Sequence, residues 1–184
     1  LIEEKGLSPN SIWLMSFTRT AIKELNDRID NLSDFNSEDG FGSLPLAGIK
    51  LSTIDSRAGK IRYGFSSKES AALFGGFDKN ISEASDILDQ AKNDDEVKYF
   101  FEGINHLILD EAQDISGDRA TFIFSLLNLL HQKCGVTIFE DPAQALYDND
   151  WSTKKHNEKS KIIKSKDFKN RPYLKLNIHE LNSL

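Results

Sequence analysis

Four short runs of strand-forming residues, separated by segments of helical periodicity, constrain the fold more than any other feature of the sequence. The runs are IWLMSF at 12–17, IKLSTI at 49–54, HLIL at 106–109 and VTIF at 136–139. Three of them are continuous or nearly continuous in apolar residues, which is typical of strands buried on both faces of a parallel sheet. The sequence therefore predicts an α/β fold with a mainly parallel sheet and helices on both faces.

The connecting segments carry the signals of helices. Thr18 or Thr20 can cap a helix in which apolar residues recur at helical spacing. We expect a second helix from about Ala58, a third over 82–92, and a fourth that opens at 116–118.

Composition excludes several classes of protein. The 184 residues are 39% hydrophobic and include 12 Phe, which is too apolar for a chain disordered throughout. The single cysteine, Cys134, excludes a disulfide framework and a cysteine-based zinc site. No window approaches the ~18 consecutive apolar residues of a membrane helix, and residues 1–6 lack the pattern of a secretory signal. We therefore expect a cytoplasmic protein with no membrane partner.

The charge is distributed unevenly along the chain. Residues 152–175 contain nine basic side chains against Glu158 and Asp167, a net charge of +7; the rest of the chain carries −13, which gives the total of −6. A basic stretch of this kind can bind the phosphates of a nucleic acid. A solvated lysine-rich loop accounts for it equally well, so both interpretations stay open.

Polar clusters follow three of the predicted strands, at 16–19, 110–114 and 140–144. In an open parallel sheet, ligands bind at the carboxyl ends of the strands. We therefore expect these clusters at one edge of the sheet, with Asp110 and Asp141 at the carboxyl ends of adjacent strands.

The pair Asp110 and Glu111 directly follows an apolar strand, which is the Walker B arrangement. The first carboxylate can hold Mg²⁺ through its water shell, and the second can orient the water that attacks a γ-phosphate. Acidic residues also cap helices, so the pair alone is a weak signal. The longer string at 110–114, DEAQD, is more specific.

Four segments resemble, in the same order, motifs of the first motor domain of superfamily 1 DNA helicases of the UvrD/Rep type. Residues 12–28 (IWLMSFTRTAIKELNDR) resemble motif Ia, and residues 51–61 (LSTIDSRAGKI) resemble motif Ib. Residues 107–114 (LILDEAQD) match motif II closely, and residues 136–147 (VTIFEDPAQALY) resemble motif III. The resemblance implies part of a RecA-like P-loop NTPase core.

The resemblance also implies roles for individual residues, with ATP and Mg²⁺ as cofactors and with single-stranded DNA and a second motor domain as partners. Asp110 would position Mg²⁺ through water, Glu111 would activate the attacking water, and Gln144 would sense the γ-phosphate. These three, together with Asp141, would form the catalytic and nucleotide-binding set. Stacking of bases on aromatic side chains would bind a strand independently of its base sequence. The implied DNA contacts are Phe17, Thr18, Arg19, Thr53, Ser56, Tyr147 and Trp151.

The same resemblance divides the chain into four parts. Residues 1–58 and 102–151 would belong to motor domain 1A. Residues 59–101 would form a small version of the 1B insertion, and residues 152–184 the lysine-rich segment with part of the motif IV region.

The sequence departs from the family's pattern in several places. No Gly-x-x-x-x-Gly-Lys-Ser/Thr string is present, and the nearest, RAGKI at 57–61, lacks the first glycine and the hydroxyl. We therefore expect a piece of a longer protein, cut after the phosphate loop, that does not hydrolyse ATP alone. Glu140 stands where the family has Gly, Ala145 where it has Ser, and Asp55, expected in a loop, where it has His.

Three hypotheses stay open: part of an ATP-dependent helicase, a single-strand-binding module, and a regulatory domain that has lost catalysis. Individual residues have plainer interpretations too. Phe17 and Tyr147 can be core aromatics, as Trp13 is expected to be. Gln113 and Asp114 can start the helix at 116–118, and Gln144 can be a turn residue.

Overall fold

The strands form one parallel sheet, in the order β2-β1-β3-β4. The computed structural model describes residues 1–38, 46–66, 76–91 and 94–140. The predicted α/β fold with a parallel sheet is confirmed, and each predicted strand matches an observed one to within a residue at either end. The strands are β1 (Ile12–Ser16), β2 (Lys50–Thr53), β3 (His106–Leu109) and β4 (Gly135–Ile138).

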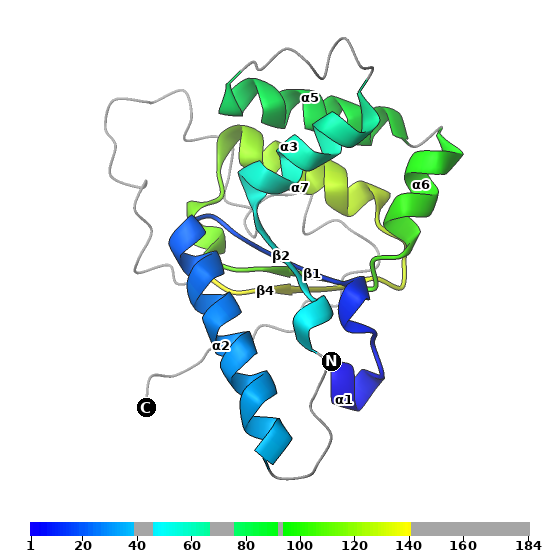
Figure 1. The fold of residues 1–184 in the computed structure, drawn as a ribbon. Helices are drawn as coiled ribbons and strands as arrows, with labels where there is room; N and C mark the ends of the chain where they lie inside the picture. The colour runs from blue at the N-terminus through cyan, green and yellow to red at the C-terminus, as the bar shows by residue number, and fades with distance from the viewer. Residues whose placement is uncertain (39–45, 67–75, 92–93, 141–184) are drawn as a thin grey trace.

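Helices cover both faces of the sheet, as predicted. In the described residues they are α1 (Ile2–Lys5), α2 (Arg19–Glu38), α3 (Ile54–Phe65), α5 (Phe77–Gln90), α6 (Asp95–Glu102) and α7 (Gly117–Leu129). Figure 1 shows α3, α5 and α7 on one face and α2 on the other. None of these helices is long and apolar enough to cross a bilayer.

Side chains of the central strand β1 serve both faces. Trp13 and Met15 are 1% and 0% exposed and belong to the core formed with α3, α5 and α7. Ile12 and Leu14 alternate with them and are buried towards the face where α2 lies. The expectation that Trp13 is a core residue is therefore correct.

Two helices begin earlier than their sequence patterns predict. Helix α3 starts at Ile54 rather than near Ala58, because the Thr53 hydroxyl accepts a hydrogen bond of 3.1 Å from the backbone N–H of Ser56 and caps the helix. The expectation that Asp55 lies in a loop is consequently wrong: it lies in the first turn of α3. Helix α5 starts at Phe77, before the predicted 82–92.

The segment at 59–101 packs into the same core as the sheet. Within its described part, α3, α5 with its C-cap residue, and α6 supply buried side chains to the cluster that contains Leu107 and Leu109 of β3. These side chains are Ile61, Ile81, Ala84, Leu88, Ala91, Val97 and Phe101. The division of the chain into subdomains stays a prediction.

The amino ends of β3 and β4 approach each other closely at His106. The imidazole is 5% exposed, and its Nε2 lies 2.8 Å from the Thr137 hydroxyl. Burial lowers the pKa of His106. A Cβ on Gly135 would meet the imidazole ring well inside van der Waals contact, so the close pairing requires glycine at this position.

We predict that Gly135→Ala destabilises the protein by about 1–3 kcal/mol, the usual cost of forcing extra volume into a packed site. Gly59→Ala is the matched control, because a Cβ there would meet nothing within 4 Å and α3 should gain about 0.5–1 kcal/mol. Urea unfolding of both variants measures these changes. A Gly135→Ala protein as stable as the wild type would contradict this account of the β3–β4 contact.

Candidate functional site at the carboxyl edge of the sheet

The parallel register gathers the residues that follow β1, β2 and β3 at one edge of the sheet. Met15 pairs with Ser52 of β2 and with Leu109 of β3, so the three strands end side by side. The backbone N–H of Asp110 donates to the Met15 carbonyl over 2.9 Å, which ties the first residue after β3 to the end of β1. Segments separated by many residues in the sequence are therefore neighbours here.

The chain turns sharply after Asp110. Glu111 has a φ of 54°, and in the described residues no other non-glycine residue has a positive φ. The Gln113 amide donates to the Glu111 carboxylate, and the backbone N–H of Ala112 donates to the Phe139 carbonyl over 3.0 Å. The turn is thus fixed both locally and by the chain beyond β4. This left-handed backbone conformation is costly for glutamate. The hydrogen bond from Gln113 positions its carboxylate.

Gln113 and Asp114 belong to a separate 3₁₀ turn, η4 (Ala112–Asp114), and are 5% and 6% exposed. Helix α7 begins later, with Ser116 at its N-cap. The plainer interpretation, in which these two residues start that helix, is therefore wrong. Their burial beside the carboxylates gives the whole DEAQD string a defined structure.

Asp110 and Glu111 form a half-buried pair of carboxylates. Burial, and then the charge of Glu111, raise the pKa of Asp110, and Glu24 of α2 adds to this effect. The described residues contain no group of three or more metal-ligating side chains. Mg²⁺ commonly keeps several waters and uses one or two carboxylates, so this pair of hard oxygen ligands fits that ion.

Ser16, the last residue of β1, adds an unsatisfied polar atom at this edge. Its side chain is 0% exposed, and its Oγ finds no hydrogen-bond partner among the described residues. An orphaned buried hydroxyl is costly and is uncommon in folded proteins. Sequence reasoning placed Ser16 in a polar cluster without giving it a role.

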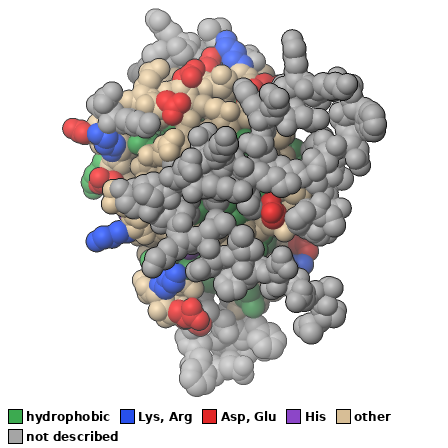
Figure 2. All heavy atoms as spheres, turned by 180° about the vertical axis from the view of Figure 1, so that it is seen from behind, with side chains coloured by type: hydrophobic (Ala, Val, Ile, Leu, Met, Phe, Trp, Pro, Cys, Tyr) green, Lys and Arg blue, Asp and Glu red, His purple; other side chains and the backbone are tan. Residues whose placement is uncertain are grey.

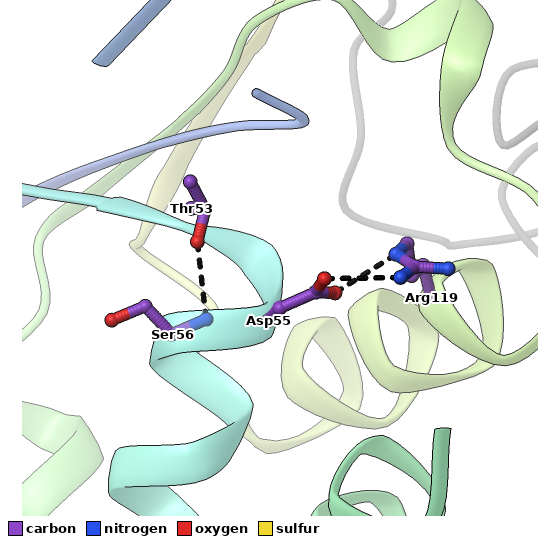
Figure 3. Close-up of polar contacts among 4 residues, drawn as sticks. All are labelled: Thr53, Asp55, Ser56 and Arg119. Atoms are coloured by element: carbon purple, nitrogen blue, oxygen red, sulfur yellow. Dashed lines mark hydrogen bonds and ion pairs between the residues drawn. The ribbon is translucent and has the colours of Figure 1, made fainter. Parts of the chain in front are cut away.

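An ion pair joins the segments after β2 and β3 (Figure 3). The Arg119 guanidinium of α7 donates to both oxygens of Asp55, over 2.8 Å from Nε and 3.0 Å from the terminal nitrogen. The guanidinium carbon also lies 5.5 Å from the centre of the Phe17 ring, within the range of a cation–π contact. Phe17 is half-buried with a cation near its ring, so it is not an ordinary core aromatic.

The expected DNA-contacting hydroxyls have structural roles. Thr18 accepts a hydrogen bond of 3.1 Å from the backbone N–H of Ala21 and caps α2, as predicted, and Thr53 caps α3 in the same way. Each cap uses the hydroxyl as an acceptor, which leaves its proton for donation to another group. Arg19 and Ser56 are exposed beside these two caps.

The string RAGKI at 57–61 lies inside helix α3. Arg57 is 8% exposed and its guanidinium carbon lies 3.9 Å from the centre of the Trp13 ring, so this residue belongs to the packing of α3 on the sheet. A helix interior commits its backbone N–H groups to internal hydrogen bonds. It cannot cradle phosphates as a glycine-rich loop does, in agreement with the sequence analysis.

Several predicted site residues lie outside the described residues. The adjacency of β3 and β4, on which the pairing of Asp110 with Asp141 depends, is confirmed. The predicted site residues outside the described part of the chain are Asp141, Gln144, Tyr147, Trp151 and the lysine-rich segment at 152–175.

Sequence reasoning missed Arg119. It lies in α7, the helix that follows β3, 64 residues from Asp55. An arginine in a helix with no motif around it gives no local signal. Only the packing of α7 beside α3 identifies it.

We predict that Asp110→Asn makes the protein more stable than the wild type at pH 7. The pKa of Asp110 lies above its ordinary value of 3.8, so the folded state prefers the protonated carboxyl. Ionisation of Asp110 therefore lowers the free energy of unfolding as pH rises from 3.8 through the raised pKa. The advantage of the variant should therefore disappear as pH falls below 3.8. Urea unfolding between pH 3 and pH 8 measures it.

Asp27→Asn, on the exposed side of α2, is the control for exchanging a carboxylate for an amide. An Asp110→Asn protein whose stability relative to the wild type does not depend on pH would contradict the account of this carboxylate.

A scan against protein-family models and a search of curated proteins found no match to the chain. The resemblance to superfamily 1 helicases therefore depends on the four sequence motifs alone.

Proposed function

We propose that the chain is part of an ATP-dependent DNA helicase or translocase, with a RecA-like core, that couples ATP hydrolysis to movement along single-stranded DNA. The observation that carries the proposal is the gathering of three motif-bearing segments at one edge of the sheet. The residues after β1, β2 and β3 resemble motifs Ia, Ib and II, and the strand order makes these segments neighbours. A coupled motor needs its nucleotide carboxylates and its DNA surface in contact in this way.

The proposed chemistry is phosphoryl transfer to water. Bound Mg²⁺ would supply positive charge to the β- and γ-phosphates of ATP. Asp110 would hold that ion's water shell, and Glu111, fixed by its turn and by Gln113, would orient the attacking water. Gln144 would sense the γ-phosphate, and Asp141 would lie beside it.

The phosphate loop limits what this chain does alone. No string in the 184 residues matches that loop, so the proposal requires one from outside this sequence. Two carboxylates hold no triphosphate without cradling amides and a lysine. The isolated chain is accordingly proposed to be inactive as an ATPase.

The proposed DNA surface runs across the same edge. Phe17, Thr18 and Arg19 follow β1, and Thr53 and Ser56 flank the start of α3. Tyr147 and Trp151 would add stacking faces, and the lysines of 152–175 would neutralise phosphates. The second motor domain is not part of this sequence, so binding should be weak.

A second candidate function is a single-strand-binding or regulatory module without catalysis. Asp55 favours it, because a carboxylate in the motif Ib segment, ion-paired to Arg119, occupies the position where the family has a histidine. In this alternative the edge binds nucleic acid but no nucleotide.

We predict weak binding of single-stranded oligonucleotides, lost in part on Tyr147→Ala. Stacking of one base is worth about 1–3 kcal/mol and does not discriminate between bases, so the loss should be the same for dT and dA oligonucleotides. Fluorescence anisotropy at low salt measures the affinity. Binding should weaken with salt by about 0.7 in log K per log salt for each phosphate neutralised.

Tyr99→Ala is the matched control for this substitution. Tyr99 is 80% exposed on α6, which leads into the amino end of β3, at the opposite edge of the sheet. Absence of oligonucleotide binding at low salt, or equal losses in the two tyrosine variants, would contradict a DNA surface at the carboxyl edge.

A further inference from the structure

We infer that Arg119 is a phosphodiester-binding residue of this edge, and that Asp55 occupies its guanidinium until a nucleic-acid phosphate displaces it. The inference rests on the proposed function and extends it to a residue that lies outside the four motifs. In this arrangement the Asp55 carboxylate competes with the phosphate for the Arg119 guanidinium.

The geometry of the pair is that of anion recognition. Arg119 presents two donors to the two oxygens of one carboxylate, over 2.8 and 3.0 Å. The same planar fork binds two oxygens of a phosphate, which is the reason arginine is used for both anions. Asp55 therefore occupies the position in which a phosphate would bind Arg119.

The surroundings of the pair favour exchange. The side chains of Arg119 and Asp55 are 28% and 27% exposed, so water and a ligand reach both partners. A phosphate on the same fork would also replace the two hydrogen bonds that Arg119 loses when Asp55 leaves. Displacing Asp55 from the guanidinium would thus disturb the fold little.

The neighbours of Arg119 match a single strand better than an isolated anion. Phe17 lies against the guanidinium at 5.5 Å, and an aromatic ring next to a phosphate-binding fork suits the alternating bases and phosphates of a strand. Ser56 is exposed on the same helix turn, but its hydroxyl points away from Arg119 (Figure 3), so the phosphate contact is assigned to the guanidinium. The ligand class is therefore a single-stranded nucleic acid, recognised through a backbone phosphate.

Two other arginines of this part of the molecule serve as a contrast. Arg57 is buried against Trp13 and donates to the Ser52 hydroxyl over 3.1 Å. Arg62 pairs with Glu83 and has a side chain only 6% exposed. Arg119 differs from both, because it has a carboxylate partner and because both side chains of its ion pair are partly exposed to solvent.

Asp55→Asn tests the inference. The substitution keeps the shape of the side chain and removes the competing charge. It should raise the affinity for a dT oligonucleotide by about fivefold, the upper end of what a surface ion pair is worth in an equilibrium constant. It should also steepen the salt dependence by about 0.7 in log K per log salt, because one more phosphate is fully neutralised. Anisotropy titrations between low and moderate salt measure both quantities.

Asp95→Asn is the matched control. Asp95 also lies in the first turn of a helix, α6, and also forms an ion pair, with Lys98 at 3.6 Å. Its substitution changes the net charge by the same amount, so any gain that comes from net charge or from the helix terminus appears in both variants. The gain specific to Asp55→Asn reports the release of Arg119.

Arg119→Gln, alone and combined with Asp55→Asn, completes the experiment. The double variant should bind like Arg119→Gln alone, because Asp55 acts only through the guanidinium. Equal gains from Asp55→Asn and Asp95→Asn, or a gain that persists without Arg119, would overturn the inference while leaving the proposed function intact. No binding by the wild type or by Asp55→Asn would contradict both. An increased affinity for inorganic tripolyphosphate but not for the oligonucleotide would also overturn it.

Discussion

The parallel pairing of β1 with β2 and β3 fixes where the residues that follow these strands lie. It aligns three strand ends, and the hydrogen bond from Asp110 to the Met15 carbonyl extends the alignment one residue past β3. A shift of the β1 register by one residue would turn Trp13 and Met15 out of the main core, which makes the register strongly specified. Backbone pairing alone therefore makes the segment with Asp110 and Glu111 a neighbour of the segment with Phe17.

The strands could be predicted from the sequence because burial on both faces leaves a continuous apolar run. The start of α3 could not, because Ile54 continues the alternating pattern of the strand run before it. The cap also depends on the hydroxyl of Thr53, a residue that ends that strand. The same error placed Asp55 in a loop. Its partner Arg119 was missed for a different reason: packing of α7 beside α3 creates the pair across 64 residues, and no local pattern encodes it.

The arginines on the helical face show how burial decides the role of one chemical group. Burial lowers the pKa of Arg57 to about 10, which still leaves it charged at neutral pH, and its interactions are with a ring, a hydroxyl and a carbonyl. That environment holds α3 on the sheet and admits no ligand. Arg119 has the same fork, but its carboxylate partner is 27% exposed, and this is the arrangement in which we propose that a phosphate replaces the carboxylate.

We propose that the segments after β1, β2 and β3 form one ligand surface. Amide chemical-shift mapping of the isotope-labelled protein during titration with a dT oligonucleotide locates the bound residues. We expect shifts at 17–19, 53–56 and 110–119, with no comparable shifts in α6 at the opposite edge. Shifts confined to α6 or to the amino ends of the strands, or no shifts at concentrations that saturate binding, would contradict it.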